Sequence, residues 1–160
     1  MCMKYILLFT LTIVCLYGCN NDDDNSQTEN LLLDEWILVS FVNDINGTII
    51  TENDVDHSNP ISNETGSITI NFLDNSIFTG NTGRNEFSGY YELNNLEPQL
   101  ILLNYISTEV NESDWGWLFV DNLYLNYNIQ TGYLENNFEV SNETLKIYYT
   151  EGKYMNFVRL

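Results

Sequence analysis

The stretch Gly80-Asn81-Thr82-Gly83-Arg84-Asn85-Glu86-Phe87-Ser88-Gly89-Tyr90-Tyr91 is the most distinctive segment of this 160-residue chain. Glycine adopts positive φ without steric cost and asparagine tolerates it, so the beginning of the stretch predicts a tight turn. The remainder predicts a strand in which Gly89 lets a neighbouring segment pack closely. A phosphate-binding loop is also glycine-rich, but it needs a helix N-terminus and a Lys-Ser/Thr pair after the loop, and neither follows here. We therefore interpret the stretch as a structural strand–turn–strand unit.

Short strands separated by turn residues are predicted on both sides of this unit. Residues 67–72 alternate cleanly, with Ile68, Ile70 and Phe72 on one face and polar residues on the other. Residues 99–105 are nearly all apolar, which indicates a central strand. The remaining segments include a hairpin at Asn46-Gly47, a long loop over residues 51–66 and a closing hairpin at the end of the chain. The other expected strands are residues 36–42, 48–50, 77–79, 87–93, 144–149 and 154–158.

One segment has the periodicity of a helix. Trp115, Phe119 and Leu123 recur every four residues, and Ser113 or Asp114 is suited to cap a helix that runs to about residue 125. Elsewhere the absence of alanine and the abundance of asparagine favour strands and turns. The predicted fold is mainly β: an antiparallel β-barrel or half-barrel with one packed helix.

The start of this helix also carries candidate binding aromatics, Trp115 and Trp117. Because the two residues are two positions apart, they cannot share one helix face. We expect one to pack into the core and the other to be exposed. An exposed tryptophan near tyrosines is suited to contact a sugar ring or a partner protein, since aromatic residues dominate binding hot spots.

The N-terminus predicts export. Lys4 precedes an apolar run over residues 5–16, which is too short to span a bilayer and typical of a secretory signal peptide. The following Leu16-Tyr17-Gly18-Cys19 resembles the lipobox of bacterial lipoproteins, which implies cleavage after residue 18 and a lipid on Cys19. Residues 19–32 are then an acidic flexible tether, and residues 33–160 form the folded domain. The run Asp22-Asp23-Asp24 resembles the surface-export signal of Bacteroidetes lipoproteins; a plain solvated linker is the alternative.

Charge limits the partners of the chain. The formal net charge is −18, so phosphate backbones and anionic lipid headgroups are both repelled. Nucleic acid is therefore not an expected partner. We expect attachment to the outer membrane to come from the lipid on Cys19.

The glycine-rich stretch resembles the signature of the META/HslJ domain. The matching residues are Gly80, Gly83, Asn85, Phe87, Gly89 and Tyr91, whereas Arg84 stands where that family usually has cysteine. The resemblance covers residues 33–160 and extends to a Thr-containing turn at Ser107-Thr108. It implies a mostly β, lipid-anchored or secreted domain associated with envelope stress and drug or heat tolerance. The family has no established catalytic residues, so none is implied here.

The side chains needed for catalysis or metal binding are scarce. His57 is the one histidine, and Cys19 is the one cysteine outside the signal peptide, so neither a catalytic triad nor a Cys/His metal site can be assembled. Neighbouring carboxylates such as Asp54 and Asp56 carry little information among 23 acidic residues. We therefore predict no enzyme activity, no cofactor and no metal.

These observations predict a non-enzymatic envelope lipoprotein that acts through contacts with an envelope protein or a small ligand. Two alternatives remain open. One is a lipocalin-like carrier with a small apolar ligand inside the barrel, which needs an interior cavity of about 300–1,000 Å³. The other is a surface glycan-binding accessory lipoprotein that uses exposed aromatic residues.

Overall fold

A computed structural model describes residues 28, 30–55, 66–94 and 96–160 of the chain. The predicted signal peptide, Cys19 and His57 lie outside these residues, as does most of the long loop predicted over residues 51–66. Two short elements flank the main fold: the 3-10 helix η2 (Glu52–Asp54) and the two-residue strand β7 (Tyr127–Asn128).

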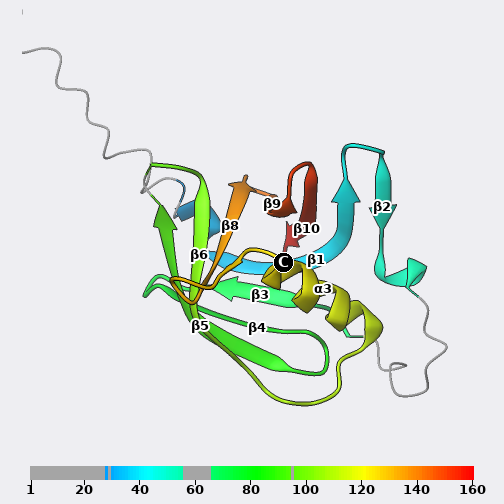
Figure 1. Ribbon diagram of the computed structural model, residues 1–160, viewed down its shortest axis with the longest axis horizontal. Helices are drawn as coiled ribbons and strands as arrows, with labels where there is room; N and C mark the ends of the chain where they lie inside the picture. The colour runs from blue at the N-terminus through cyan, green and yellow to red at the C-terminus, as the bar shows by residue number, and fades with distance from the viewer. Residues whose placement is uncertain (1–27, 29, 56–65, 95) are drawn as a thin grey trace, which may run out of the picture.

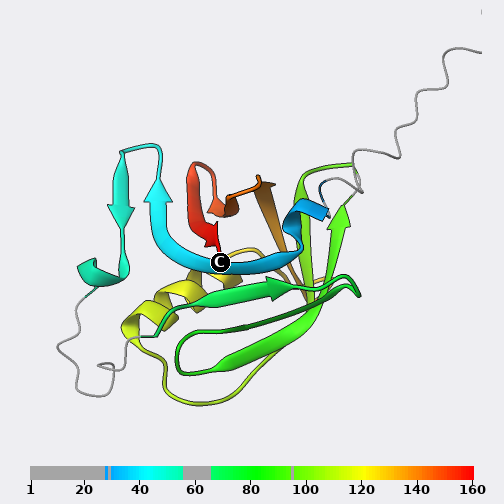
Figure 2. The ribbon, with the colours of Figure 1, turned by 180° about the vertical axis from the view of Figure 1, so that it is seen from behind.

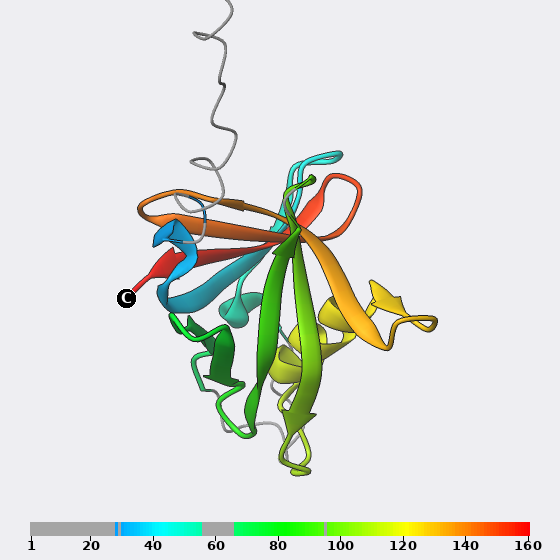
Figure 3. The same cartoon turned by 90° about the vertical axis from the view of Figure 1, so that its left-hand side faces the viewer.

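The fold is a closed antiparallel β-barrel (Figure 3). Its strands pair in the order β1-β3-β4-β5-β6-β8-β9-β10, and pairing of β10 with β1 closes the ring. The hairpin strand β2 pairs with β1, and β7 pairs with β8. The strands are β1 (Asp34–Asn43), β2 (Thr48–Ile50), β3 (Thr69–Phe72), β4 (Ile77–Asn81), β5 (Glu86–Asn94), β6 (Gln99–Ser107), β8 (Tyr133–Val140), β9 (Thr144–Thr150) and β10 (Lys153–Arg159).

Strand β1 bends along its length and pairs with three strands (Figure 1). Its first half pairs with β3 and its second half with β2, while β10 runs along the opposite edge. The predicted Asn46-Gly47 turn joins β1 to β2, and Gly47 has φ +73°. The predicted hairpin is therefore confirmed.

Large side chains occupy the barrel interior. The predicted alternation is confirmed, because Ile68, Ile70 and Phe72 are almost fully buried. Phe72 meets Tyr91 edge to face, with ring centroids 5.1 Å apart, which is the favoured geometry for aromatic pairs. The largest fully buried side chains are Trp36, Trp115, Tyr91, Phe72, Phe78, Phe119 and Phe157.

The predicted helix is α3 (Asp114–Tyr124), which lies against the barrel (Figures 1 and 2). The Ser113 hydroxyl caps its start by accepting a hydrogen bond from the Gly116 backbone N–H at 3.0 Å. Two side chains anchor the helix to opposite strands. Trp115 meets Phe41 of β1 at 4.9 Å, and Phe119 stacks on Phe87 of β5 at 5.6 Å.

One expectation needs correction. Leu32, which the prediction placed in the tether, is fully buried in the core, and its carbonyl accepts a hydrogen bond from the Trp36 indole. The folded part therefore begins before residue 32. Strand β6 has neighbours on both sides, as predicted, and its side chains Leu100 and Leu102 are buried.

Candidate functional site

The glycines of the signature permit three close backbone approaches. Gly83 has φ +87° and lies against Gly66, since a Cβ on Gly83 would stand 2.5 Å from the Gly66 Cα. A Cβ on Gly80 would stand 2.2 Å from the carbonyl oxygen of Thr69 and would also collide with the Phe87 ring. Gly89 is similarly confined by β6. The interpretation of the stretch as a structural unit agrees with these contacts.

Asn85 joins the β4–β5 turn to the loop between β6 and α3. Its Nδ2 donates to the Val110 carbonyl at 2.7 Å and to the Glu112 carboxylate. Its Oδ1 accepts from the Val110 N–H and the Thr108 hydroxyl, each at 2.8 Å. Every hydrogen-bonding site of this buried amide is thus used, and the loop that leads into α3 is held in one position.

Glu112 is a buried carboxylate at the start of α3. It is 8% exposed, and its Oε1 accepts hydrogen bonds from Asn85 and from the Thr82 hydroxyl at 2.6 Å. Its Oε2 has no hydrogen-bond partner. The positive end of the α3 dipole favours a negative charge here, and Gly116 makes room for it, because a Cβ there would stand 2.1 Å from Oε2.

A groove of about 470 Å³ runs beside the outer face of α3. One wall is a helical stripe at spacings of three and four residues, formed by Trp117, Val120, Asp121 and Tyr124. Trp117 is 50% exposed, so its ring is available to a ligand. The other wall comes from the β4–β5 turn, β6 and the β6–α3 loop: Asn85, Tyr105, Ser107, Thr108, Glu109, Val110, Asn111 and Glu112.

A β-bulge directs Tyr105 toward this groove. Asn104 and Tyr105 of β6 both lie opposite the single residue Gly89, and Asn104 has φ +51°. The extra residue shifts the alternation of β6, and the Tyr105 ring stacks on Phe87 at 5.4 Å. The Tyr105 ring also stacks on Phe78 at 6.2 Å and meets the Tyr124 ring edge to face at 5.7 Å.

The Tyr105 hydroxyl is buried beside the Ser107 side chain. Burial raises the pKa of Tyr105 well above the ordinary value, and the neighbouring Tyr124 and Glu112 add to the effect. Burial also raises the pKa of Tyr124. Both phenols are therefore neutral at physiological pH and can donate or accept a hydrogen bond.

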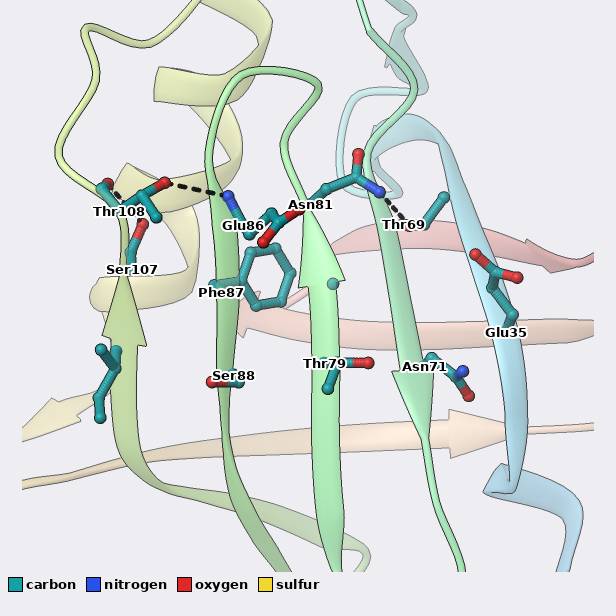
Figure 4. A pocket seen from close by; sticks show the side chains of 12 residues that line it. Glu35, Thr69, Asn71, Thr79, Asn81, Glu86, Phe87, Ser88, Ser107 and Thr108 are labelled. Carbon is teal, nitrogen blue, oxygen red and sulfur yellow. Dashed lines mark hydrogen bonds between the residues drawn. The ribbon is translucent and has the colours of Figure 1, made fainter.

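A second depression, of about 560 Å³, lies on the exposed face of β1, β3, β4, β5 and β6 (Figure 4). Polar side chains line it, and the Asn81 amide donates to the Thr69 hydroxyl at 2.8 Å. Its one aromatic lining residue is Phe87, whose side chain is buried. One cross-strand row runs through Glu35, Asn71, Thr79, Ser88 and Ile106. The lining of this depression includes no exposed ring on which a ligand could stack.

The two candidate tryptophans have different environments. Trp115 is 1% exposed and packs in the core, so it is not available to a ligand, whereas Trp117 lines the groove. Asn85 of the signature also reaches the groove. Sequence reasoning missed Tyr105, Tyr124 and Glu112. The stripe through residues 117, 120, 121 and 124 was a detectable signal for Tyr124.

Closed antiparallel barrels of this kind occur among proteins that bind small ligands. None of the described helices is long and apolar enough to cross a membrane. Within the same residues, no group of three or more His, Cys, Asp or Glu side chains is placed to hold a metal ion.

No family model and no curated protein matches the sequence. Solved structures of similar fold include an NMR structure of a protein from Burkholderia xenovorans, at 16% identity and a TM-score of 0.54, covering 84% of this chain and 87% of that chain. They also include a crystal structure of a DUF4847 family protein from Bacteroides vulgatus, at 14% identity and a TM-score of 0.54, covering 82% of this chain and 96% of that chain. At these identities the likeness shows the fold alone.

Proposed function

We propose that this protein is a lipid-anchored, non-enzymatic binding protein of the outer membrane, and that the groove beside α3 is its ligand site. The half-exposed ring of Trp117 in that groove is the observation that carries the proposal. The anchor is the lipid predicted on Cys19. The resemblance to the META/HslJ domain suggests a role in envelope maintenance or stress tolerance.

The groove has the features of a small-molecule site. Its volume of about 470 Å³ falls in the range of known ligand pockets. Aromatic rings and polar groups converge in it, and the hydrogen bonds of Asn85 hold its loop wall in place. A wall that is already ordered loses less entropy when a ligand binds.

A site outside the barrel is favoured over a carrier site inside it. Large buried rings of the strands contact one another, such as Phe72 with Tyr91, and contact the helix, such as Phe41 with Trp115 of α3. An apolar ligand inside would have to displace these rings, and displacing well-packed core side chains is costly. The lipocalin-like alternative therefore has weaker support than the groove.

Fluorescence titration tests the ligand site. The chain has three tryptophans, and Trp36 and Trp115 are almost fully buried, so a ligand in the groove should perturb the emission of Trp117 alone. A panel of neutral oligosaccharides, fatty acids and organic amines should contain at least one compound that changes the emission of the wild type but not that of Trp117→Phe. A response that persists in Trp117→Phe would contradict the groove and favour an interior site.

Cell fractionation tests the anchor separately. Cys19→Ser should move the protein from the membrane fraction to the soluble fraction. Retention of Cys19→Ser on the membrane would contradict the lipoprotein part of the proposal without affecting the ligand site.

A further inference from the structure

We infer that the ligand of the groove is an organic ammonium ion with the dimensions of a short diamine or polyamine. This inference rests on the proposed function, because it assigns a chemical class to the ligand of the same site. Three features carry it: the charge of the lining, the aromatic faces and one buried carboxylate oxygen without a hydrogen-bond partner.

The lining carries charge of one sign. Glu109, Glu112 and Asp121 line the groove, and the lining includes no Lys, Arg or His. The two ion pairs found among the described residues, Lys146–Glu139 and Arg159–Asp34, lie elsewhere. The net charge of −18 adds a long-range attraction for cations. An anionic ligand would meet only repulsion here.

The aromatic residues of the groove also favour a positively charged ligand. A cation is attracted to the face of an aromatic ring, and tryptophan provides the strongest such site. Trp117 and Tyr124 lie seven residues apart on one helix face, and the Asp121 carboxylate lies between them in sequence. A chain with an ammonium group at each end can therefore contact a ring and a carboxylate together.

One buried carboxylate oxygen lacks the donor that an ammonium supplies. Glu112 is more than nine-tenths buried, its Oε2 has no hydrogen-bond partner and no described basic residue pairs with it. An ammonium group has three N–H donors and no acceptor, so it can supply that donor. Because Oε2 is closed to solvent, this contact requires the Glu112 side chain to turn toward the groove.

A neutral sugar fits this lining less well. It could stack on Trp117 and hydrogen-bond to the carboxylates, but it brings no positive charge to a lining that holds three acidic side chains and no basic one. A cation adds an electrostatic attraction to the same contacts.

Isothermal titration calorimetry of the purified protein with spermidine and 1,4-diaminobutane, in about 0.15 M salt, tests the inference. Both amines should bind with one-site stoichiometry. The matched control ligand is 1,4-butanediol, which has the same carbon chain without charge and should not bind. Binding of the diol as tightly as the diamine would overturn the inference.

Variants locate the site. Asp121→Asn should weaken spermidine binding about fivefold, and Trp117→Ala about tenfold. The matched controls are Asp74→Asn, an exposed carboxylate outside the groove, and Tyr90→Ala, an exposed ring on β5; each should change the affinity less than twofold. Equal weakening by Asp121→Asn and Asp74→Asn would mean that amines merely condense on an acidic surface, and would overturn the inference.

Different results would refute the ligand site beside α3 and the ammonium class of its ligand. If only oligosaccharides or fatty acids perturb Trp117, the groove remains the site and the ammonium assignment is overturned. If no compound in the panel perturbs Trp117 and amines do not bind, the ligand site and the ammonium assignment are both overturned.

Discussion

Replacing Asn85 by aspartate exchanges the NH2 group of a buried amide for an oxygen and should have a large effect. The substitution keeps the oxygen that accepts from Thr108 and the Val110 N–H. It removes both N–H donors, which leaves the Val110 carbonyl unpaired and places a second carboxylate against Glu112.

The magnitude follows from these contacts. Each lost hydrogen bond costs about 1 kcal/mol, and more where the partner is charged. Two carboxylates at about 4 Å repel by about 4 kcal/mol at an effective dielectric constant of about 20. We expect Asn85→Asp to lower the free energy of unfolding by about 4–6 kcal/mol at neutral pH, and Asn85→Ala by about 3 kcal/mol.

The effect of Asn85→Asp should depend on pH. The neighbouring Glu112 would raise the pKa of the new carboxyl in the folded state above its unfolded value of about 3.9. The repulsion is therefore absent below about pH 4 and grows as pH rises, by at most about 1.4 kcal/mol per pH unit, until the folded-state pKa is passed.

Urea unfolding followed by tryptophan fluorescence measures these changes as shifts of the midpoint at unchanged slope. Asn46→Asp is the matched control, because Asn46 lies in an exposed hairpin turn where its Oδ1 only accepts from the Thr48 N–H. Asn46→Asp should lower the free energy of unfolding by less than about 0.5 kcal/mol. The reasoning fails if Asn85→Asp stays within about 1 kcal/mol of the control, or if its cost does not vary with pH.

Three further substitutions have defined outcomes. Gly80→Ala should destabilise the protein by about 1–3 kcal/mol, because its Cβ would stand 2.2 Å from the Thr69 carbonyl oxygen; thermal unfolding within about 2 °C of the wild type would contradict this. Leu32→Ala should cost about 2–5 kcal/mol in urea unfolding, whereas a neutral effect would return Leu32 to the tether. Burial raises the pKa of Tyr105 in the folded state, so the free energy of unfolding of the wild type should fall as pH rises above about 10, by up to about 1.4 kcal/mol per pH unit. Tyr105→Phe should reduce that dependence on pH between about pH 9 and 11. An unchanged dependence would show that the pKa of Tyr105 is the same in the folded and unfolded states.

Local patterns predicted much of the fold. The alternation over residues 67–72, the Asn46-Gly47 turn and the four-residue spacing from Trp115 each report a short-range geometric constraint. Strand β8 was missed because the polar run Glu135-Asn136-Asn137 interrupts its apolar residues, although Asn136 is fully buried. Closure of the barrel was left open, since the pairing of β1 with β10 joins opposite ends of the domain.

The site was less predictable than the fold. Trp117 could be proposed as a binding residue because two residues that are two positions apart on a helix, such as Trp115 and Trp117, lie on different faces. The partners of Asn85 could not, because its contacts with Thr108, Val110 and Glu112 cross 23 to 27 residues. The orientation of Tyr105 toward the groove depends on a bulge opposite Gly89, and no periodic pattern in the sequence marks such an inserted residue.

A crystal structure of the protein grown with spermidine is the most direct test of the central claim, that the groove beside α3 is the ligand site. The account predicts one amine nitrogen within about 3 Å of the Glu112 or Asp121 carboxylate and another over the face of Trp117. Ligand density inside the barrel, or on the polar face of β3, β4 and β5, would contradict it.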